Sequence, residues 1–290
     1  MPPVWRFIPQ SDLVMPSAGK AERKGLSKMK KRICAEILSQ REIAQNIYEM
    51  WIRTELVEEV KPGQFIGVYT WNNSLLLPRP ISICEVSEDR TALRIVYRRG
   101  EKGTGTYEMS QYAPGSTFSN INILGPLGNG FPLEKGEGKK VFLIGGGIGI
   151  PPLVELAKRL KAEKHIIVGY RDQTQFFLKN DLEQYGQVYI ATEDGSSGTK
   201  GNVMDAIREN ELEAGVIFAC GPMPMLRAIK AYAAEKGIPA YISLEEHMAC
   251  GVGACLGCVV KTKEVHHHTY VNNARICTDG PVFEASEVEI

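Results

Sequence analysis

Four cysteines near the C-terminus have the spacing expected of ligands to an iron–sulfur cluster. Three lie in a C-x4-C-x2-C run and one follows at a distance, and together they are Cys250, Cys255, Cys258 and Cys277. This is the ligand pattern of plant-type [2Fe–2S] ferredoxins, which hold two irons with four thiolates. Glycines between the ligands let the backbone adopt positive φ angles and approach a cluster closely. The pattern predicts that the chain carries electrons.

Structural zinc and disulfides are the competing uses of these cysteines. Zinc sites usually combine two separated pairs of ligands, whereas this chain has a single C-x2-C pair. Disulfides require an oxidising compartment, and nothing in the sequence indicates export. The other thiols, Cys34, Cys84 and Cys220, are therefore expected to stay reduced. The run His266–His268 is expected to form a hairpin tip rather than a metal site, because consecutive side chains point in different directions.

Composition narrows the class of protein further. The chain has 290 residues, with 34 Lys+Arg and 34 Asp+Glu, so its formal net charge is zero. A neutral chain has no general attraction to nucleic acid or to an anionic membrane. No run approaches the roughly 18 apolar residues that would span a bilayer, and the N-terminus lacks the pattern of a secretory signal. We expect a cytoplasmic protein that binds neither nucleic acid nor membrane.

The pattern of the sequence changes along the chain and indicates a multidomain β plus α/β fold. Residues 1–28 lack periodicity and are expected to be a disordered extension. Six short alternating runs in residues 29–133 predict an antiparallel β-barrel. Apolar strands alternate with amphipathic helices in residues 138–238, which predicts a doubly wound parallel sheet. Residues 239–290 contain the cysteine motif and too little apolar content for an independent core.

A glycine-rich turn follows the first apolar strand of the α/β region. Its sequence is GGGIGIPP, and the glycines expected to leave backbone N–H groups open to a ligand are Gly146, Gly147 and Gly149. N–H groups at the start of a helix suit a phosphate, although Ile150 replaces the third glycine of the dinucleotide fingerprint. A second segment, Cys220-Gly221-Pro222, follows another strand at the sheet edge where ligands bind. Glycines also permit tight packing, and Cys220 alone fits a plain buried thiol, but the two segments together favour a nucleotide site.

Three segments of the barrel region could hold a second nucleotide. Arg79-Pro80-Ile81-Ser82 opens a strand, where the arginine could clamp a phosphate and the serine could bond a ring atom. Val96-Tyr97-Arg98 ends another strand. Gly103-Thr104 precedes a short helical stretch and could supply N–H groups to a pyrophosphate, as could the repeated dipeptide Gly105-Thr106. These spots exceed the needs of one nicotinamide dinucleotide.

The order of these segments resembles the electron transfer subunit of NAD-dependent dihydroorotate dehydrogenase, a branch of the ferredoxin-reductase superfamily. The resemblance spans residues 29–290 and rests on RPIS (79–82), YR (97–98), GT (103–104), GPLGNGF (125–131), GGGIGIPPL (145–153), CGPMPML (220–226) and the cysteine motif. It implies FAD held by the RPIS and YR…GT segments, with Arg79 on the pyrophosphate and Ser82 on the flavin. It implies NAD(H) facing the glycine-rich turn and the CGP segment. Ile81 stands where the wider superfamily often has tyrosine, a departure that the dihydroorotate branch shares.

The resemblance also implies a partner and a direction of electron flow. An FMN-containing dihydroorotate dehydrogenase catalytic subunit, in a heterotetramer, would send electrons through the cluster to FAD and then to NAD⁺ in pyrimidine biosynthesis. FAD is needed because NAD exchanges a hydride whereas the cluster passes single electrons. The loop Ala249–Val259 is then expected to carry part of an apolar contact patch.

Several alternatives stay open from the sequence. The same modules occur in the small subunit of a ferredoxin–NAD(P) oxidoreductase or of a hydrogenase or sulfide dehydrogenase complex, and a nucleotide-responsive binding module with structural zinc would need no electron flow. Residues Glu245–His247 could assist proton transfer, although a solvated rim is the preferred interpretation. The choice between NAD and NADP is open, because Arg171-Asp172 offers both charges.

Overall fold

Six antiparallel strands close into a barrel in the computed structural model, which describes residues 30–265 and 271–290. The strands are β1 (Lys31–Ala44), β2 (Ile47–Arg53), β3 (Phe65–Tyr69), β4 (Arg79–Val86), β5 (Ala92–Arg98) and β6 (Asn120–Leu127), in the order β1-β2-β5-β4-β3-β6. The barrel predicted from six alternating runs is confirmed. The predicted disordered extension (1–28) and the His266–His268 run lie outside the described residues.

The barrel core explains why these runs form strands. Branched apolar side chains such as Ile52, Ile66 and Ile95 alternate with outward residues along each strand and are fully buried inside. Two short helices complete this part of the fold, η2 (Glu55–Glu59) and α1 (Gly105–Met109). The Thr104 hydroxyl accepts a hydrogen bond from the Tyr107 N–H at 3.3 Å and so fixes the start of α1.

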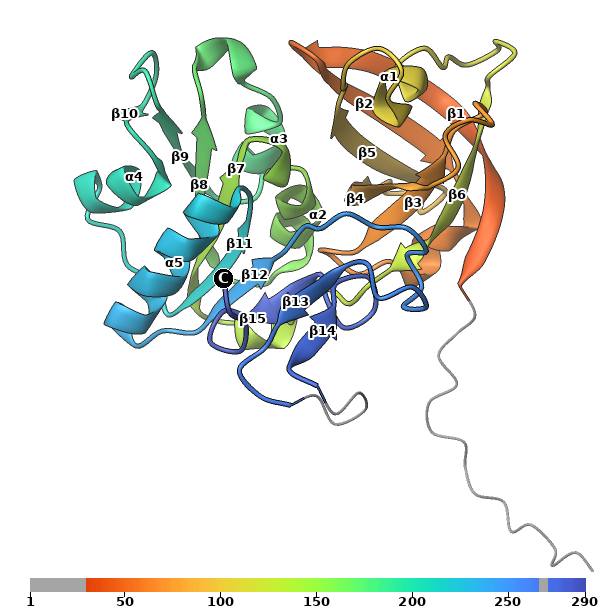
Figure 1. The fold of residues 1–290 in the computed structure, drawn as a ribbon. Coiled ribbons are helices and arrows are strands. Elements are labelled where there is room, and N and C mark those ends of the chain that lie inside the picture. Colours follow the sequence, from red (N-terminus) through yellow and green to blue (C-terminus); the bar gives the residue numbers. More distant parts are fainter. Residues whose placement is uncertain (1–29, 266–270) are drawn as a thin grey trace, which may run out of the picture.

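A seven-stranded sheet lies beside the barrel (Figure 1). Its order is β10-β9-β8-β7-β11-β12-β15, and its strands are β7 (Lys140–Gly146), β8 (Glu163–Tyr170), β9 (Gln187–Thr192), β10 (Thr199–Lys200), β11 (Val216–Cys220), β12 (Ala240–Ser243) and β15 (Val282–Glu284). All neighbours are parallel except β15, which pairs antiparallel with β12. The predicted parallel sheet is confirmed, with an antiparallel edge strand added.

Helices cover both faces of this sheet, as a doubly wound fold requires. They are η3 (Leu133–Lys135), η4 (Gly147–Gly149), α2 (Pro152–Arg159), η5 (Gln173–Gln175), α3 (Lys179–Glu183), α4 (Val203–Glu209) and α5 (Met223–Lys236). Leu153 of α2 and Leu182 of α3 belong to the apolar core on one face. Ile207 of α4 and Leu226 of α5 belong to the core on the other face. No helix in the described part of the chain is long and apolar enough to cross a bilayer.

The C-terminal segment joins both larger parts of the fold. Its strands β12 and β15 extend the sheet, while β13 (Val259–Lys261) and β14 (Asn273–Arg275) pair with one another below it (Figure 1). Ile276 and Phe283 pack in the same core cluster as the sheet residues. The segment thus shares the core of the sheet, which agrees with its low apolar content.

Buried charges join the barrel to the sheet. Arg94 of β5 pairs with Glu49 and Glu85 of the barrel and with Asp181 of α3. Lys158 of α2 contacts Glu85 at 3.1 Å. We call these five residues the junction network. Because both Arg94 and Glu49 are buried, each charge depends on its partners in place of water.

Candidate cofactor sites

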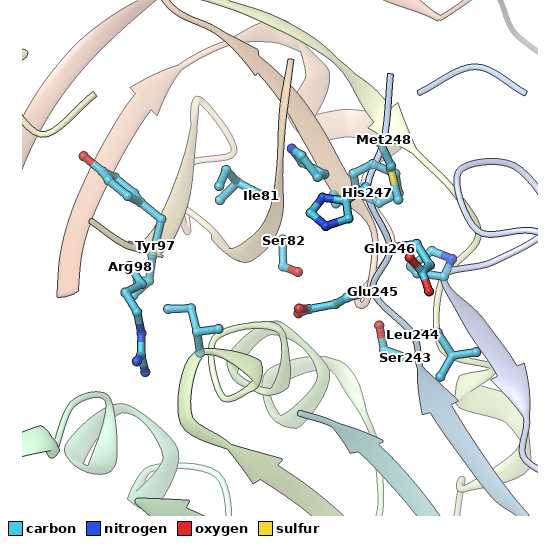
Figure 2. Close-up of a pocket in the computed structure, with 15 residues that line it drawn as sticks. Ile81, Ser82, Tyr97, Arg98, Ser243, Leu244, Glu245, Glu246, His247 and Met248 are labelled. Carbon is cyan, nitrogen blue, oxygen red and sulfur yellow. The ribbon is translucent and has the colours of Figure 1, made fainter. Parts of the chain in front are cut away.

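A cavity of about 460 Å³ lies where the barrel, the sheet and the C-terminal segment meet. We call it the barrel–sheet cavity. Figure 2 shows Ile81 and Ser82 of β4, Tyr97 and Arg98 at the end of β5, and the segment Ser243–Met248 around it. The lining also includes Pro80, Val96 and Ile148. The structure therefore brings together two of the barrel segments that the sequence singled out, on the neighbouring strands β4 and β5, with a third segment from beyond residue 240.

Arg79 and the start of α1 form a second cluster outside the cavity lining. A Cβ atom on Gly105 would lie 2.2 Å from Arg79 Nε, so glycine at this position lets the guanidinium lie against the helix start. Gly103 has a φ of +92°, and a Cβ there would meet nothing within 4 Å. Thr104 is occupied as the N-cap of α1. Arg79 thus lies beside the predicted Gly103–Thr106 turn, with open space above Gly103.

One wall of the barrel–sheet cavity carries groups that sequence reasoning left largely unassigned. The Glu245 residue is exposed to solvent through the open cavity. The protein packed around its carboxylate still removes part of the surrounding water, and this desolvation raises the pKa of Glu245. The nearby Cys220 thiol is buried, and burial together with the Glu245 charge raises its pKa to about 12. A hydrogen bond with Ser243 acts in the opposite direction and lowers this pKa. Glu245, Glu246 and His247 were expected to form a solvated rim, and they line the cavity. These residues directly follow β12, at the carboxyl edge of the sheet where ligands bind, and this position in the sequence could have indicated that they line a ligand site.

A second cavity, of about 590 Å³, lies at the carboxyl ends of β7, β8 and β9. We call it the sheet-edge cleft. Gly146, Gly147 and Pro222, which the sequence assigned to a nucleotide site, are among the residues that line it. Arg98 lines both this cleft and the barrel–sheet cavity, which makes it the residue shared by the two sites.

The other predicted residues of the nucleotide site serve close packing. A Cβ on Gly149 would lie 2.4 Å from the Cys220 carbonyl oxygen, and one on Gly221 would lie 3.0 Å from the Gly146 N. Gly149, Cys220 and Gly221 are not among the residues that line the cleft. The absence of a side chain at Gly149 and Gly221 allows the glycine-rich turn to pack against the end of β11.

The four cysteines of the motif come together as two pairs. The Cys250 Sγ accepts hydrogen bonds from the N–H groups of Val252 (3.4 Å) and Ala254 (3.3 Å). These bonds and one with the Cys255 thiol lower the pKa of Cys250 to about 7, although burial opposes the shift. In the second pair, burial and a hydrogen bond with Cys258 raise the pKa of Cys277 to about 12.

The pairing fits two irons better than one zinc ion. Cys250 is hydrogen-bonded with Cys255, and Cys258 with Cys277. A structural zinc site needs four ligands around one ion, whereas a [2Fe–2S] cluster spreads four thiolates over two irons. The second pair, Cys258 and Cys277, is 2% and 1% exposed, while Cys255 is exposed. One side of such a cluster would thus face solvent and the other the protein interior.

The GPLGNGF segment holds the cluster-bearing region against the barrel. The Asn129 side chain donates to the carbonyls of Asp279 (2.9 Å) and Val282 (2.8 Å) and accepts from the Val282 N–H (3.0 Å). Gly128 has a φ of +71°, and a Cβ there would lie 2.4 Å from Pro281 Cδ. Gly251 of the cysteine loop likewise lies close to Leu127. Sequence reasoning noted this segment as a shared motif without giving it a role.

Barrel, sheet-edge cleft and cysteine loop together define an iron–sulfur oxidoreductase of the ferredoxin-reductase type. Residues 245–289 match the iron–sulfur cluster binding domain of dihydroorotate dehydrogenase B, and residues 143–231 match an oxidoreductase NAD-binding domain. The chain belongs to the family of dihydroorotate dehydrogenase B electron transfer subunits. It is 42% identical to the NAD(+) electron transfer subunits from Geobacillus sp. (strain WCH70) and Bacillus caldolyticus, over 87% of this chain and 96% of each relative.

Solved structures agree with this family. An NADH-dependent reduced ferredoxin–NADP oxidoreductase is 27% identical, with a TM-score of 0.76 over 88% of this chain and 89% of that one. A ferredoxin NADP⁺ reductase from Neisseria gonorrhoeae is 14% identical, with a TM-score of 0.60 over 76% of this chain and 95% of that one. The second likeness concerns the fold alone. Both agree with the expected ferredoxin-reductase architecture.

Proposed function

We propose that this chain passes electrons between a [2Fe–2S] cluster and NAD by way of FAD in the barrel–sheet cavity. One observation carries the proposal. Residues Ser243–Met248 line the cavity, and the same segment continues through Ala249 into the first cysteine of the motif, Cys250. The predicted flavin site and the predicted cluster site are thereby built on one continuous stretch of chain. When bound, FAD exchanges a hydride with NAD and single electrons with the cluster.

The residues that hold FAD are proposed to be those of the barrel segments. Arg79 would bind the pyrophosphate from its position against Gly105, because a guanidinium makes charge-assisted bonds to phosphate oxygens. Ser82 and Ile81 would contact the flavin ring in the cavity, with Tyr97 behind them in the barrel core, where its hydroxyl donates to Gln40. In the Gly103-Thr104 turn beside Arg79, the Gly103 N–H would add a donor to the pyrophosphate, whereas the Thr104 N–H donates to the Glu101 carbonyl at 3.1 Å.

NAD(H) is proposed to bind in the sheet-edge cleft. Backbone N–H groups of Gly146 and Gly147 would take its pyrophosphate at the end of β7. Arg98 reaches both cavities, so the nicotinamide end would lie toward Arg98 and the flavin. Bringing the two rings together would exclude water from the transfer of the hydride.

Cys250, Cys255, Cys258 and Cys277 are proposed as the cluster ligands. The N–H donors to Cys250 are the kind of contact that tunes the potential of a cluster. We also propose a cytoplasmic location and domain boundaries at 29–133, 138–238 and 239–290. The free thiols at Cys34, Cys84 and Cys220 are consistent with a reducing compartment.

The name of the family implies a catalytic partner subunit. We propose that the partner is an FMN-containing dihydroorotate dehydrogenase and that the assembly is a heterotetramer. Apolar side chains around the cysteine loop support a docking surface near the cluster, since Val252, Leu256 and Val259 are 43%, 60% and 39% exposed. Such a surface would bring the partner's flavin close to Cys255.

The test compares the isolated chain with the reconstituted complex. The purified chain, loaded with FAD and cluster, should oxidise NADH with artificial electron acceptors and should show no reduction by dihydroorotate. Adding the partner subunit should give dihydroorotate-dependent reduction of NAD⁺. Reduction of NAD⁺ by dihydroorotate with the isolated chain alone would overturn the division of labour between the two subunits.

A further inference from the structure

An arginine connects the two separate parts of the cysteine motif. Arg275 lies in β14, and the strand register places it opposite Val259 of β13, the residue directly after Cys258 (Figure 1). Arg275 also lies two residues before Cys277, the fourth cysteine of the motif. Its Nη1 donates to the carbonyl of Gly253, within the loop of the first three cysteines, at 3.2 Å. The guanidinium therefore contacts that loop from the segment that brings in the fourth cysteine.

A carboxylate fixes the position of this guanidinium. The Asp279 Oδ2 accepts from the Arg275 Nε at 3.1 Å and from the Arg275 backbone N–H at 2.8 Å, and the Asp279 Oδ1 accepts from Nη2 at 3.3 Å. The side chains of Arg275 and Asp279 are 27% and 18% exposed, so solvent screens their charges only in part. A cation and an anion are thus held in one geometry beside the cysteine motif.

The two charges lie where they would act on a bound cluster. The Ile276 N–H donates to the Cys258 carbonyl at 2.8 Å, which holds the segment of Arg275 against the cysteine loop. The guanidinium is near enough to Cys258 and Cys277 for its charge to act on their ionised thiols. A cluster that accepts one electron gains one negative charge. A nearby cation stabilises that added charge, whereas a nearby carboxylate opposes it.

We propose that Arg275 raises the reduction potential of the cluster and that Asp279 limits this effect, an inference that rests on the cluster proposed above. Neither residue is a ligand, and both act through charges placed around the ligands. The bonds to Asp279 and to the Gly253 carbonyl hold the cation where it favours the reduced cluster. The pair thereby sets how readily the cluster takes an electron on its way between the partner subunit and the flavin.

The experiment measures the midpoint potential of the cluster in the chain loaded with FAD and cluster. A redox titration is followed by electron paramagnetic resonance. Arg275→Gln replaces the cation with a neutral hydrogen-bond donor. At a fixed ambient potential, the ratio of reduced to oxidised cluster should fall about tenfold, which is a shift of about −59 mV for one electron. Asp279→Asn removes the carboxylate and should raise the same ratio above that of the parent.

Three further variants separate charge from structure. The double variant, with both substitutions, should have a potential between those of the two single variants. Arg275→Lys keeps a cation and should lie closer to the parent than Arg275→Gln does. Arg159→Gln is the matched control and should leave the potential unchanged. The Arg159 side chain is also 27% exposed, pairs with Glu155 four residues away, and donates to the Val60 carbonyl at 2.9 Å in another part of the fold.

Opposite shifts in Arg275→Gln and Asp279→Asn are expected of two opposite charges, and a loosened loop would not produce them. Shifts in the same direction, or no shift in either variant, would overturn the inference. If Arg275→Gln does not retain a cluster, Asp279→Asn decides by itself, because an unchanged or lowered potential there contradicts the effect of charge. A parent chain that binds FAD but shows no [2Fe–2S] signal would overturn the proposed function itself, and this inference with it.

Discussion

The barrel is joined to its two neighbours by different kinds of interaction. The junction network links it to the sheet through buried charges centred on Arg94. Asn129 links it to the cluster-bearing segment through uncharged hydrogen bonds to backbone groups. Hydride transfer between a flavin and a nicotinamide requires close alignment of two rings, and small misplacements are costly. The junction that depends on the exact placement of buried charged partners therefore lies on the side where alignment matters more.

Breaking the junction network should have the largest effect on stability. Arg94→Met removes the shared cation and leaves Glu49 and Glu85 without it, which should lower the free energy of unfolding by about 3–5 kcal/mol. Arg41 is the matched control, because it pairs with the same Glu49 from a side chain that is 71% exposed. Arg41→Ala should cost at most about 1 kcal/mol. Equal costs for the two variants in urea unfolding would show that the network does not join the barrel to the sheet.

Removal of Arg79 should act on the flavin and spare the nicotinamide side. Losing a charge-assisted contact to phosphate should cost about 1.5–3 kcal/mol, so Arg79→Ala should bind FAD at least tenfold more weakly. Arg32 is another barrel arginine, which lies 4.0 Å from the ring centroid of Tyr69, and Arg32→Ala should leave FAD affinity unchanged. Flavin retention is measured by dialysis followed by absorbance. Full retention in Arg79→Ala would remove Arg79 from the FAD site.

Removing the hydrogen bonds of Asn129 should destabilise only the segment that this side chain contacts. Asn129→Ala leaves two carbonyls and one N–H without their partner, which should cost about 1–3 kcal/mol and loosen residues 275–284. Hydrogen exchange should quicken in that stretch and stay unchanged in β7 and β8. Asn210→Ala is the control, because Asn210 Nδ2 donates to a carbonyl within α4. Faster exchange throughout the sheet in Asn129→Ala would contradict the separation of the two junctions.

The smallest expected effect is a change in the pH dependence of thermal stability when Glu245, on the wall of the barrel–sheet cavity, is replaced. Burial raises the pKa of Glu245 in the folded, flavin-free chain, so its charged form opposes folding and this penalty appears as pH rises through the folded pKa. Glu245→Gln should therefore gain thermal stability relative to the parent as pH increases from 4 to 8. Hydrogen bonds from Ser87 and Thr91 lower the pKa of Asp89, so Asp89→Asn should show the opposite trend. A pH-independent difference for Glu245→Gln would place its carboxylate in bulk solvent.

The sequence predicted what depends on local pattern. Alternating runs indicated the barrel strands, and the cysteine spacing indicated a loop whose thiols the structure brings together in pairs. It missed what depends on distant segments meeting. Arg94 lies 87 positions from Asp181, and no spacing rule connects them. Gly149 resembled a phosphate-binding glycine, but its contact with the Cys220 backbone appears only once β7 and β11 lie side by side.

The account depends most on the continuity of Ser243–Cys258 between flavin and cluster. The direct measurement is anaerobic addition of NADH to the isolated, fully loaded chain, followed by visible absorbance for the flavin and by electron paramagnetic resonance for the cluster. The account predicts that both become reduced in the parent, and that Cys255→Ser lacks the cluster signal while its flavin still bleaches. Cys34→Ser should behave as the parent does. A flavin that bleaches beside a cluster that stays oxidised under excess NADH would contradict electron transfer within this chain.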